Sequence, residues 1–389
     1  MSELQAFLKT NHAPHISKPE AGERHRVAEF SLTDGSVEVP EDAPEGTALE
    51  FLEKAGQNPD EWEVTGYKRI EYGNPAQPFV STRFTYKRRE GAGERVPIDD
   101  LLAMIHEHAG RARPQRVGES PVPGAAVLIG DMQIGQIGPD GDPFEAIENS
   151  LRAIDQAADE IERQGGAEEI LVAWLGDHIE GFVSQGGKNS WRTRLTLTEQ
   201  IRATRRIMYY AIEVLEPLCH RLVMAAVPGN HGRVEAGNGT GTRADDNHDT
   251  DALVAVAEAL ELTGDRTGVE TYVPEVDQIS LAVTVGGLTW GLVHGDKWRR
   301  GGQFNWWREQ TFHNGPTAAA DVLCGGHWHT LQMMEEGEKL FIQVPTLGTD
   351  GAYWTNLHGS RPKPGVVLAL TDGTEVVGVI PIRVRKESA

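Results

Sequence analysis

The sequence predicts an α/β fold in which short buried strands alternate with amphipathic helices. Five runs of five or six mostly apolar residues have the length and composition of strands that cross a sheet buried on both faces. Helical periodicity between them predicts amphipathic helices over 143–164, 195–218 and 252–262. The predicted strands are 125–129, 170–175, 222–227, 288–293 and 319–323.

Polar clusters follow these apolar runs. They are Gly130-Asp131-Met132-Gln133, Gly176-Asp177, Gly229-Asn230-His231, His294-Gly295-Asp296 and Gly326-His327-Trp328-His329. In open α/β sheets ligands bind beyond the carboxyl ends of the strands, so we expect one site there. Carboxylate, amide oxygen and imidazole groups together suit Mn²⁺, Fe²⁺ or Zn²⁺.

In this order the clusters resemble the calcineurin-like metallophosphoesterase superfamily, whose pattern is D-x-H, GD, GNH, a lone His and GHxH. The resemblance covers roughly residues 125–359 and implies a two-sheet α/β/α sandwich. It also implies two groups of metal ligands that share Asp177. The first metal would take Asp131, Gln133, Asp177 and His329, and the second Asp177, Asn230, His294 and His327.

The resemblance implies a hydrolytic reaction at phosphorus. Two divalent ions, Mn²⁺ in our expectation with Fe²⁺ or Zn²⁺ as alternatives, would lie about 3.5–4 Å apart across Asp177 and hold a hydroxide between them. The hydroxide would attack the phosphorus, and His231 would serve as general acid or charge stabiliser for the leaving oxygen. Asp177 and His231 are therefore the predicted catalytic residues.

Two positions depart from the family pattern. Gln133 stands where the family usually has His, and its neutral amide oxygen should bind the first metal more weakly. Some branches of the superfamily also carry Gln there. Arg233 follows the GNH block in place of an acid. It would face a phosphate bidentately or be a surface arginine.

Composition and charge restrict the class of protein. The chain has 389 residues, 39% of them hydrophobic, and its net charge is −21 from 37 basic and 58 acidic side chains. Such a surface argues against a general DNA-coating protein but permits a nuclease with one local basic patch. Two cysteines, no signal-peptide pattern and no long apolar run predict a cytoplasmic protein with no membrane partner. A homo-oligomer is left open.

We predict four segments: a mobile tail over 1–30, a small α+β accessory domain over 31–110, a linker over 111–124 and the catalytic domain over 125–389. The accessory domain would contain a hairpin over 62–72 and 79–89 and a helix over 97–106. The hairpin carries basic residues among aromatic ones. This pattern fits either a single-stranded nucleic-acid platform or a small sheet with a solvated basic face.

A second basic and aromatic stretch, 297–308, follows His294. It fits either core packing or a loop that stacks bases and contacts phosphates. The predicted substrate-binding residues are Arg233, Lys297, Arg299 and Arg300.

The clusters are most similar to the nuclease branch related to double-strand-break repair, and the GNHGR and HGD-KW-RGG segments resemble phage-encoded phosphoesterases. We therefore predict a metallophosphoesterase that hydrolyses phosphodiester bonds as a DNA exo- or endonuclease. The alternatives are a nucleotide or cyclic-nucleotide phosphohydrolase or a phosphoprotein phosphatase of the same fold. A catalytically weakened nucleic-acid-binding protein is a further alternative.

Overall fold

The chain divides into two compact units, Met1–Glu94 and Arg95–Ala389. The computed structural model describes residues 28–30, 34–40, 47–55, 57, 59–74, 77–89, 97–109, 122–138, 141–182, 193–235, 241–264, 268–349 and 363–384.

The larger unit contains two packed β-sheets. The first has the strand order β15-β14-β5-β6-β7-β8, and its strands β5 to β8 are parallel to one another. The second has the order β12-β13-β11-β10-β9, with β10, β11 and β13 parallel. The strands of the first sheet are β5 (Val122–Ile129), β6 (Ala167–Trp174), β7 (Cys219–Ala226), β8 (Val269–Tyr272), β14 (Gly365–Thr371) and β15 (Val376–Arg383). Those of the second are β9 (Ser280–Val285), β10 (Leu288–Val293), β11 (Val322–Gly325), β12 (Gln332–Glu336) and β13 (Lys339–Gln343).

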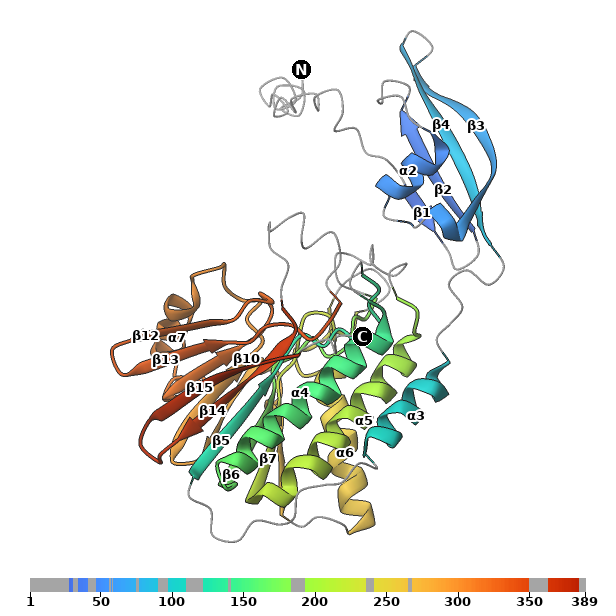
Figure 1. The fold of residues 1–389 in the computed structure, drawn as a ribbon. Helices are drawn as coiled ribbons and strands as arrows, with labels where there is room; N and C mark the ends of the chain where they lie inside the picture. The colour runs from blue at the N-terminus through green and yellow to red at the C-terminus, as the bar shows by residue number, and fades with distance from the viewer. Residues whose placement is uncertain are drawn as a thin grey trace, which may run out of the picture. The chain divides into compact units, whose positions relative to one another are not determined.

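Helices cover the outer faces of both sheets (Figure 1). Three lie against the first sheet, α4 (Pro143–Arg163), α5 (Leu197–Leu215) and α6 (His248–Thr263), and α3 (Ile98–Ala109) packs on α4 and α5. The short helix α7 (Gln303–Phe312) lies at the second sheet. The predicted two-sheet α/β/α sandwich is confirmed.

Alternation along each strand divides the core into layers. In β6, Leu171 and Ala173 face the second sheet, whereas Val172 and Trp174 face the helices, because successive side chains of a strand point to opposite faces. All four are fully buried. Sheets buried on both faces therefore explain why the strands read as continuous apolar runs.

The smaller unit is a four-stranded sheet of order β1-β2-β4-β3. Its elements are β1 (Ala28–Phe30), β2 (Asp34–Pro40), α2 (Ala48–Lys54), β3 (Trp62–Asn74) and β4 (Gln77–Arg88). Thr47 and Glu50 form a capping box that begins α2. The buried Tyr86 donates a hydrogen bond to the Ala48 carbonyl (2.6 Å), which ties the sheet to this helix.

The boundaries of the predicted domains differ from those observed. The predicted helix over 97–106 exists as α3, but it belongs to the larger unit, where Leu101 and Ile105 enter the main core. His108 of α3 also pairs with Asp155 of α4 (2.6 Å). Residues 28–30, predicted in the tail, form β1, and 122–124, predicted in the linker, begin β5. The rest of the predicted tail and linker lies outside the described residues.

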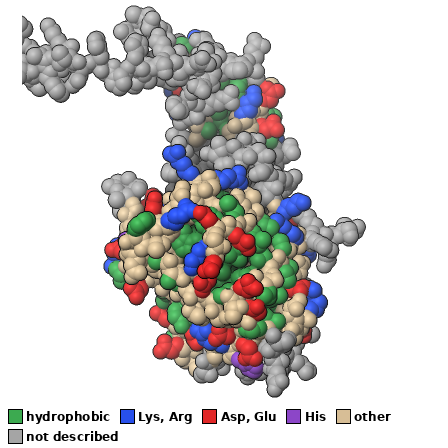
Figure 2. Space-filling view, turned by 90° about the vertical axis from the view of Figure 1, so that its left-hand side faces the viewer, with side chains coloured by type: hydrophobic (Ala, Val, Ile, Leu, Met, Phe, Trp, Pro, Cys, Tyr) green, Lys and Arg blue, Asp and Glu red, His purple; other side chains and the backbone are tan. Residues whose placement is uncertain are grey.

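The aromatic residues of 297–308 pack into the core. Trp298, Trp306 and Trp307 are at most 9% exposed and cover Leu323 and Phe341 on the outer face of the second sheet. On this side of the molecule, basic side chains lie scattered among acidic and apolar ones (Figure 2). The structure therefore contradicts base stacking by these three tryptophans.

The basic residues of the accessory hairpin lie on both faces of its sheet. Arg88 lies on the aromatic face, with its guanidinium 5.7 Å from the centre of the Trp62 ring. Phe84 stacks on Phe51 of α2, with ring centroids 5.9 Å apart, whereas Arg83 binds Glu38 (2.8 Å) on the other face. Tyr72 and Phe79 have side chains outside the described set. Among the described side chains, Arg83 and Arg88 are paired with Glu38 and Glu61, which favours a small accessory sheet over a nucleic-acid platform.

None of the helices within the described ranges is long and apolar enough to span a membrane. Cys219 and Cys324 are both buried and free, so they form no disulfide with each other.

Candidate metal centre

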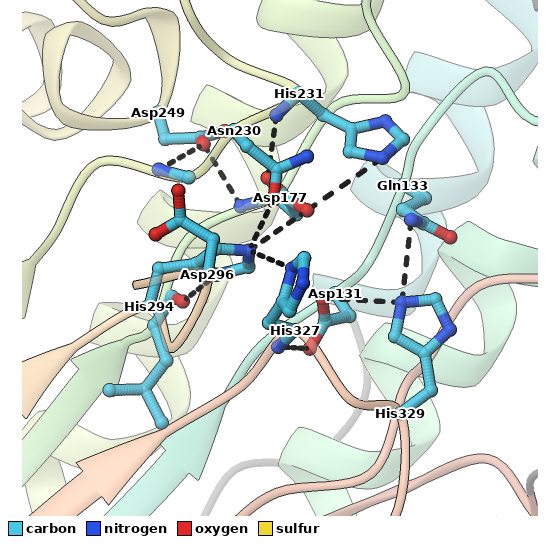
Figure 3. Close-up of polar contacts among 12 residues, drawn as sticks. Asp131, Gln133, Asp177, Asn230, His231, Asp249, His294, Asp296, His327 and His329 are labelled. Atoms are coloured by element: carbon cyan, nitrogen blue, oxygen red, sulfur yellow. Dashed lines mark hydrogen bonds and ion pairs between the residues drawn. The ribbon is translucent and has the colours of Figure 1, made fainter. Parts of the chain in front are cut away.

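The polar residues that follow β5, β6, β7, β10 and β11 converge at the carboxyl ends of these strands (Figure 3). The structure brings together all seven predicted metal ligands: Asp131, Gln133, Asp177, Asn230, His294, His327 and His329. They come from five loops that are far apart in the sequence.

One group of ligand atoms surrounds Nε2 of His294. This atom lies 3.0 Å from Asp177 Oδ2, 3.2 Å from Asn230 Oδ1 and 3.3 Å from His327 Nδ1. Metal bonds of about 2.1 Å place neighbouring ligand atoms about 3.0 to 3.4 Å apart, depending on the geometry. Asp177, His294 and His327 form a cluster able to hold a metal ion.

The second group contains Asp131, Gln133 and His329. Nε2 of His329 lies 3.3 Å from Asp131 Oδ1 and 3.4 Å from Gln133 Nε2. Two buried oxygens of this group, Oδ1 of Asp131 and Oε1 of Gln133, accept no hydrogen bond from any residue that the structure describes. A half-turn of the Gln133 amide would bring its oxygen to the position of Nε2. Buried oxygens without donors are costly unless a cation binds them, so the residues present fit a metal.

Backbone strain is concentrated in these ligands. Asp131, Gln133, Asp177, His327 and His329 all have left-handed φ angles, of 52°, 45°, 54°, 67° and 51°. Outside glycine such angles are uncommon, each costs about 1 kcal/mol or more, and they cluster at functional sites. The left-handed backbone conformations therefore set the directions in which these five side chains point.

Two glycines allow the loops to approach closely. A Cβ on Gly229 would lie 2.2 Å from the backbone nitrogen of Asp177, and one on Gly326 would lie 2.7 Å from Asp131 Oδ2. Neither position has room for a side chain. The glycines of the GNH and GHxH blocks are thus required by packing around Asp177 and Asp131.

Asp249 holds two of the loops in place, a role that the sequence analysis missed. Its Oδ2 accepts from the backbone N–H groups of Asp177 (2.9 Å) and Gly229 (3.1 Å), and its Oδ1 from that of His178 (2.9 Å). Asp249 lies in the first turn of α6, just after the N-cap residue Asn247. The only sequence signal for this role was an acidic residue, Asp249, two positions after the N-cap residue of α6.

His231 lies beside the ligands without joining either group. Its Nδ1 donates to the Glu180 carbonyl (2.8 Å), and its Nε2 is 3.8 Å from Asp177 Oδ2. Burial alone would lower the pKa of His231, but the carboxylates of Asp177 and Glu180 raise it to about 10. In the metal-free protein its imidazole therefore carries a proton on Nε2 at neutral pH.

Charge coupling also shifts the pKa values of the ligands. Burial would raise the pKa of Asp177, but His294 and His231 hold it well below its usual range. Burial opposes protonation of His294, yet Asp177 raises its pKa to about 10. Burial and the neighbouring His294 lower the pKa of His327 to about 4. The metal-free centre is thus a network of opposite charges.

The four predicted substrate-binding residues have different surroundings. Arg233 and Lys297 line one small cavity next to the ligands. Arg300 donates to Thr330 (3.1 Å), and its guanidinium lies 5.9 Å from the centre of the Trp328 ring. Arg299 is exposed.

Comparisons with known proteins give limited information. The sequence matches no protein-family model and no curated protein. Among solved structures, Vps29 from Entamoeba histolytica complexed with Zn²⁺ matches with 14% identity and a TM-score of 0.31, over 67% of this chain and 98% of that one. A novel archaeal phosphodiesterase matches with 14% identity and a TM-score of 0.30, over 66% and 99%. A predicted phosphoesterase from Streptococcus pneumoniae matches with 13% identity and a TM-score of 0.28, over 64% and 83%. At these TM-scores the likenesses say nothing about activity, and the function proposed below rests on this chain's own residues.

Proposed function

We propose that this protein is a metal-dependent phosphodiesterase of the calcineurin-like type that acts on DNA as an exo- or endonuclease. The observation that carries the proposal is the convergence of seven predicted ligands in two groups around Asp177, with His231 beside them. Divalent ions in such a site, Mn²⁺ in our proposal, lower the pKa of water and withdraw charge from phosphoryl oxygens.

The chain's own residues would position the substrate and supply a proton. Asp177 lies between the two ligand groups, and the three backbone hydrogen bonds to Asp249 fix the loops that carry it and Gly229. The Glu180 carbonyl accepts the Nδ1 proton of His231, so the other ring nitrogen, Nε2, faces the ligands. A proton held there can pass to the leaving oxygen of a phosphodiester.

DNA as the substrate rests on the sequence resemblance and on exposed cations near the centre. Lys297, Arg299 and Arg300 follow the ligand His294 directly in sequence, and Arg233 follows Asn230 and His231. The net charge of −21 favours a second candidate, a nucleotide phosphohydrolase, because a long nucleic acid gains most from a continuous basic surface.

The test is hydrolysis in Mn²⁺ of end-labelled single- and double-stranded DNA, bis-p-nitrophenyl phosphate and a nucleotide panel, with Asp177→Ala as the blank. DNA degradation that is absent from the blank supports the nuclease. Hydrolysis of nucleotides with intact DNA supports the second candidate. No hydrolysis of any substrate by a protein that binds the metal would overturn the proposal and point to a binding protein.

A further inference from the structure

A small cavity lies beside the metal-ligand cluster, and the chemistry described above does not use it. It has a volume of about 190 Å³, and we call it the Arg233 cavity. The residues in its wall that carry the inference are Gly229, Arg233, Arg243, Asn247, Asp296 and Lys297. In Figure 3, Asp296 lies on the side of the cluster opposite Gln133 and His329, so the cavity flanks the ligand group around His294.

The wall of the Arg233 cavity carries three cationic side chains and one carboxylate. Arg243 is oriented by Asp245 (2.8 Å), and Lys297 binds Asp296 (2.6 Å). Within the described part of the chain, the Arg233 guanidinium has no hydrogen-bond or ion-pair partner. The cavity therefore has an excess of positive charge and one guanidinium available for a ligand.

The position of Arg233 is fixed by an irregular hairpin. Val234 donates to the Asp246 carbonyl (3.4 Å), and Thr242 donates to the Val234 carbonyl (3.1 Å). The side-chain stem of Arg233 crosses Gly241, where a Cβ would lie only 3.2 Å from its Cδ. Asn247, at the end of the hairpin, donates to the Gly229 carbonyl (2.8 Å). The hairpin is thus attached to the loop that carries Asn230, and Arg233 is held at a defined place relative to the metal centre.

The size of the cavity limits its ligand. Its volume of about 190 Å³ is room for several water molecules. Pockets for drug-sized ligands are larger, about 300–1,000 Å³. The cavity therefore has room for a phosphate-sized anion. A guanidinium recognises a phosphate through two parallel hydrogen bonds.

We propose that the Arg233 cavity binds the phosphate group next to the scissile phosphodiester along a nucleotide chain. This inference rests on the proposed function and makes it more specific, because the preferred substrate then carries at least two phosphates. The second phosphate is either a terminal phosphomonoester or the next phosphodiester of the strand. Both present the same anionic oxygens to Arg233.

The experiment compares kcat/KM in Mn²⁺ for the thymidine oligonucleotides TpT, pTpT, TpTp and TpTpT. TpT has a single phosphate, pTpT and TpTp add a terminal phosphate on either side, and TpTpT adds a second diester. The variants are Arg233→Gln and, as a matched control, Arg163→Gln. Arg163 is an exposed arginine in the last turn of α4, at the opposite end of the strands from the metal centre.

We expect wild type to prefer at least one two-phosphate substrate over TpT by roughly ten- to hundredfold, the value of one or two charge-assisted hydrogen bonds. Arg233→Gln should bring this ratio close to one, and Arg163→Gln should keep it. If wild type prefers only pTpT or TpTp over TpT, the cavity binds a terminal phosphomonoester. If it prefers TpTpT equally, the cavity binds the next phosphodiester of the strand. Equal hydrolysis of all four substrates by wild type, or an unchanged ratio in Arg233→Gln, overturns the inference and leaves the phosphodiesterase standing. If wild type degrades end-labelled DNA but hydrolyses none of the four, the inference is overturned; if it degrades neither, the proposed DNA activity itself fails.

Discussion

Asp249→Asn is the substitution that most sharply tests how the metal centre is built. The asparagine has the same shape but only one acceptor oxygen. With this oxygen at the Oδ2 position, the side chain still accepts from Asp177 and Gly229, and its NH₂ group faces the N–H of His178 across 2.9 Å. Leaving that buried N–H unsatisfied costs about 1–3 kcal/mol, and losing the charge weakens each of the other two bonds by about 1 kcal/mol.

The free energy of unfolding should therefore fall by about 3–5 kcal/mol, which is smaller than the total stability of many domains. Because Asp249 positions Asp177, Mn²⁺ affinity should also fall, by about 10–100-fold. Urea unfolding and calorimetric titration with Mn²⁺ measure the two effects. The control is Asp251→Asn, which removes only an ion pair with Arg205 whose side chains are 57% and 38% exposed. It should cost about 0–1 kcal/mol and leave metal affinity unchanged. Equal results for the two variants would refute the role assigned to Asp249.

Three further predictions concern the ligands. Asp177→Ala should lose both metals and all turnover, whereas His231→Ala should keep the metals and lose about 10²–10⁴-fold in kcat. Metal analysis and steady-state kinetics measure these effects, and hydrolysis by Asp177→Ala would contradict the prediction. Gln133→His should tighten Mn²⁺ binding at the group with Asp131, since imidazole is a stronger ligand than an amide; an unchanged titration would count against that placement. Burial lowers the pKa of His294, but Asp177 raises it to a net value of about 10. Because an imidazole must be neutral to bind a metal, Mn²⁺ binding below pH 10 should release a proton. Mn²⁺ affinity should then rise by about tenfold per pH unit for each proton released. Calorimetric titration with Mn²⁺ in buffers of different ionisation enthalpy measures the proton release, and finding none would contradict the prediction.

The parts of the fold that depend on local pattern could be predicted from the sequence. The run Leu288–Val293 is β10 to the residue, and Pro143 begins α4 with Asp142 as its N-cap. Buried strands are recognised by continuous apolar composition, and helices by the periodicity of apolar residues and by their capping residues. That one site lies at the strand ends could be predicted because each polar cluster follows such a strand, whereas the seven ligands were proposed from the resemblance of these clusters to the metallophosphoesterase pattern.

The features that could not be predicted depend on contacts between residues that are far apart in the sequence. Asp249 acts on Asp177, which is 72 residues away in the chain. The faces of the accessory hairpin could not be assigned from its composition, because alternation separates Phe84 from Arg83 but leaves Arg88 beside Trp62. α3 follows the accessory sheet in sequence, but Leu101 packs in the other unit. Composition alone does not say which sheet a helix will cover.

The most direct test of the central claim is anomalous diffraction from crystals of the protein grown with Mn²⁺. We predict two peaks, one bounded by Asp131, Gln133 and His329 and the other by Asn230, His294 and His327, with Asp177 between them. A crystal with Mn²⁺ bound elsewhere, or with no ion in contact with Asp177, would contradict the two-metal centre on which the proposed activity rests.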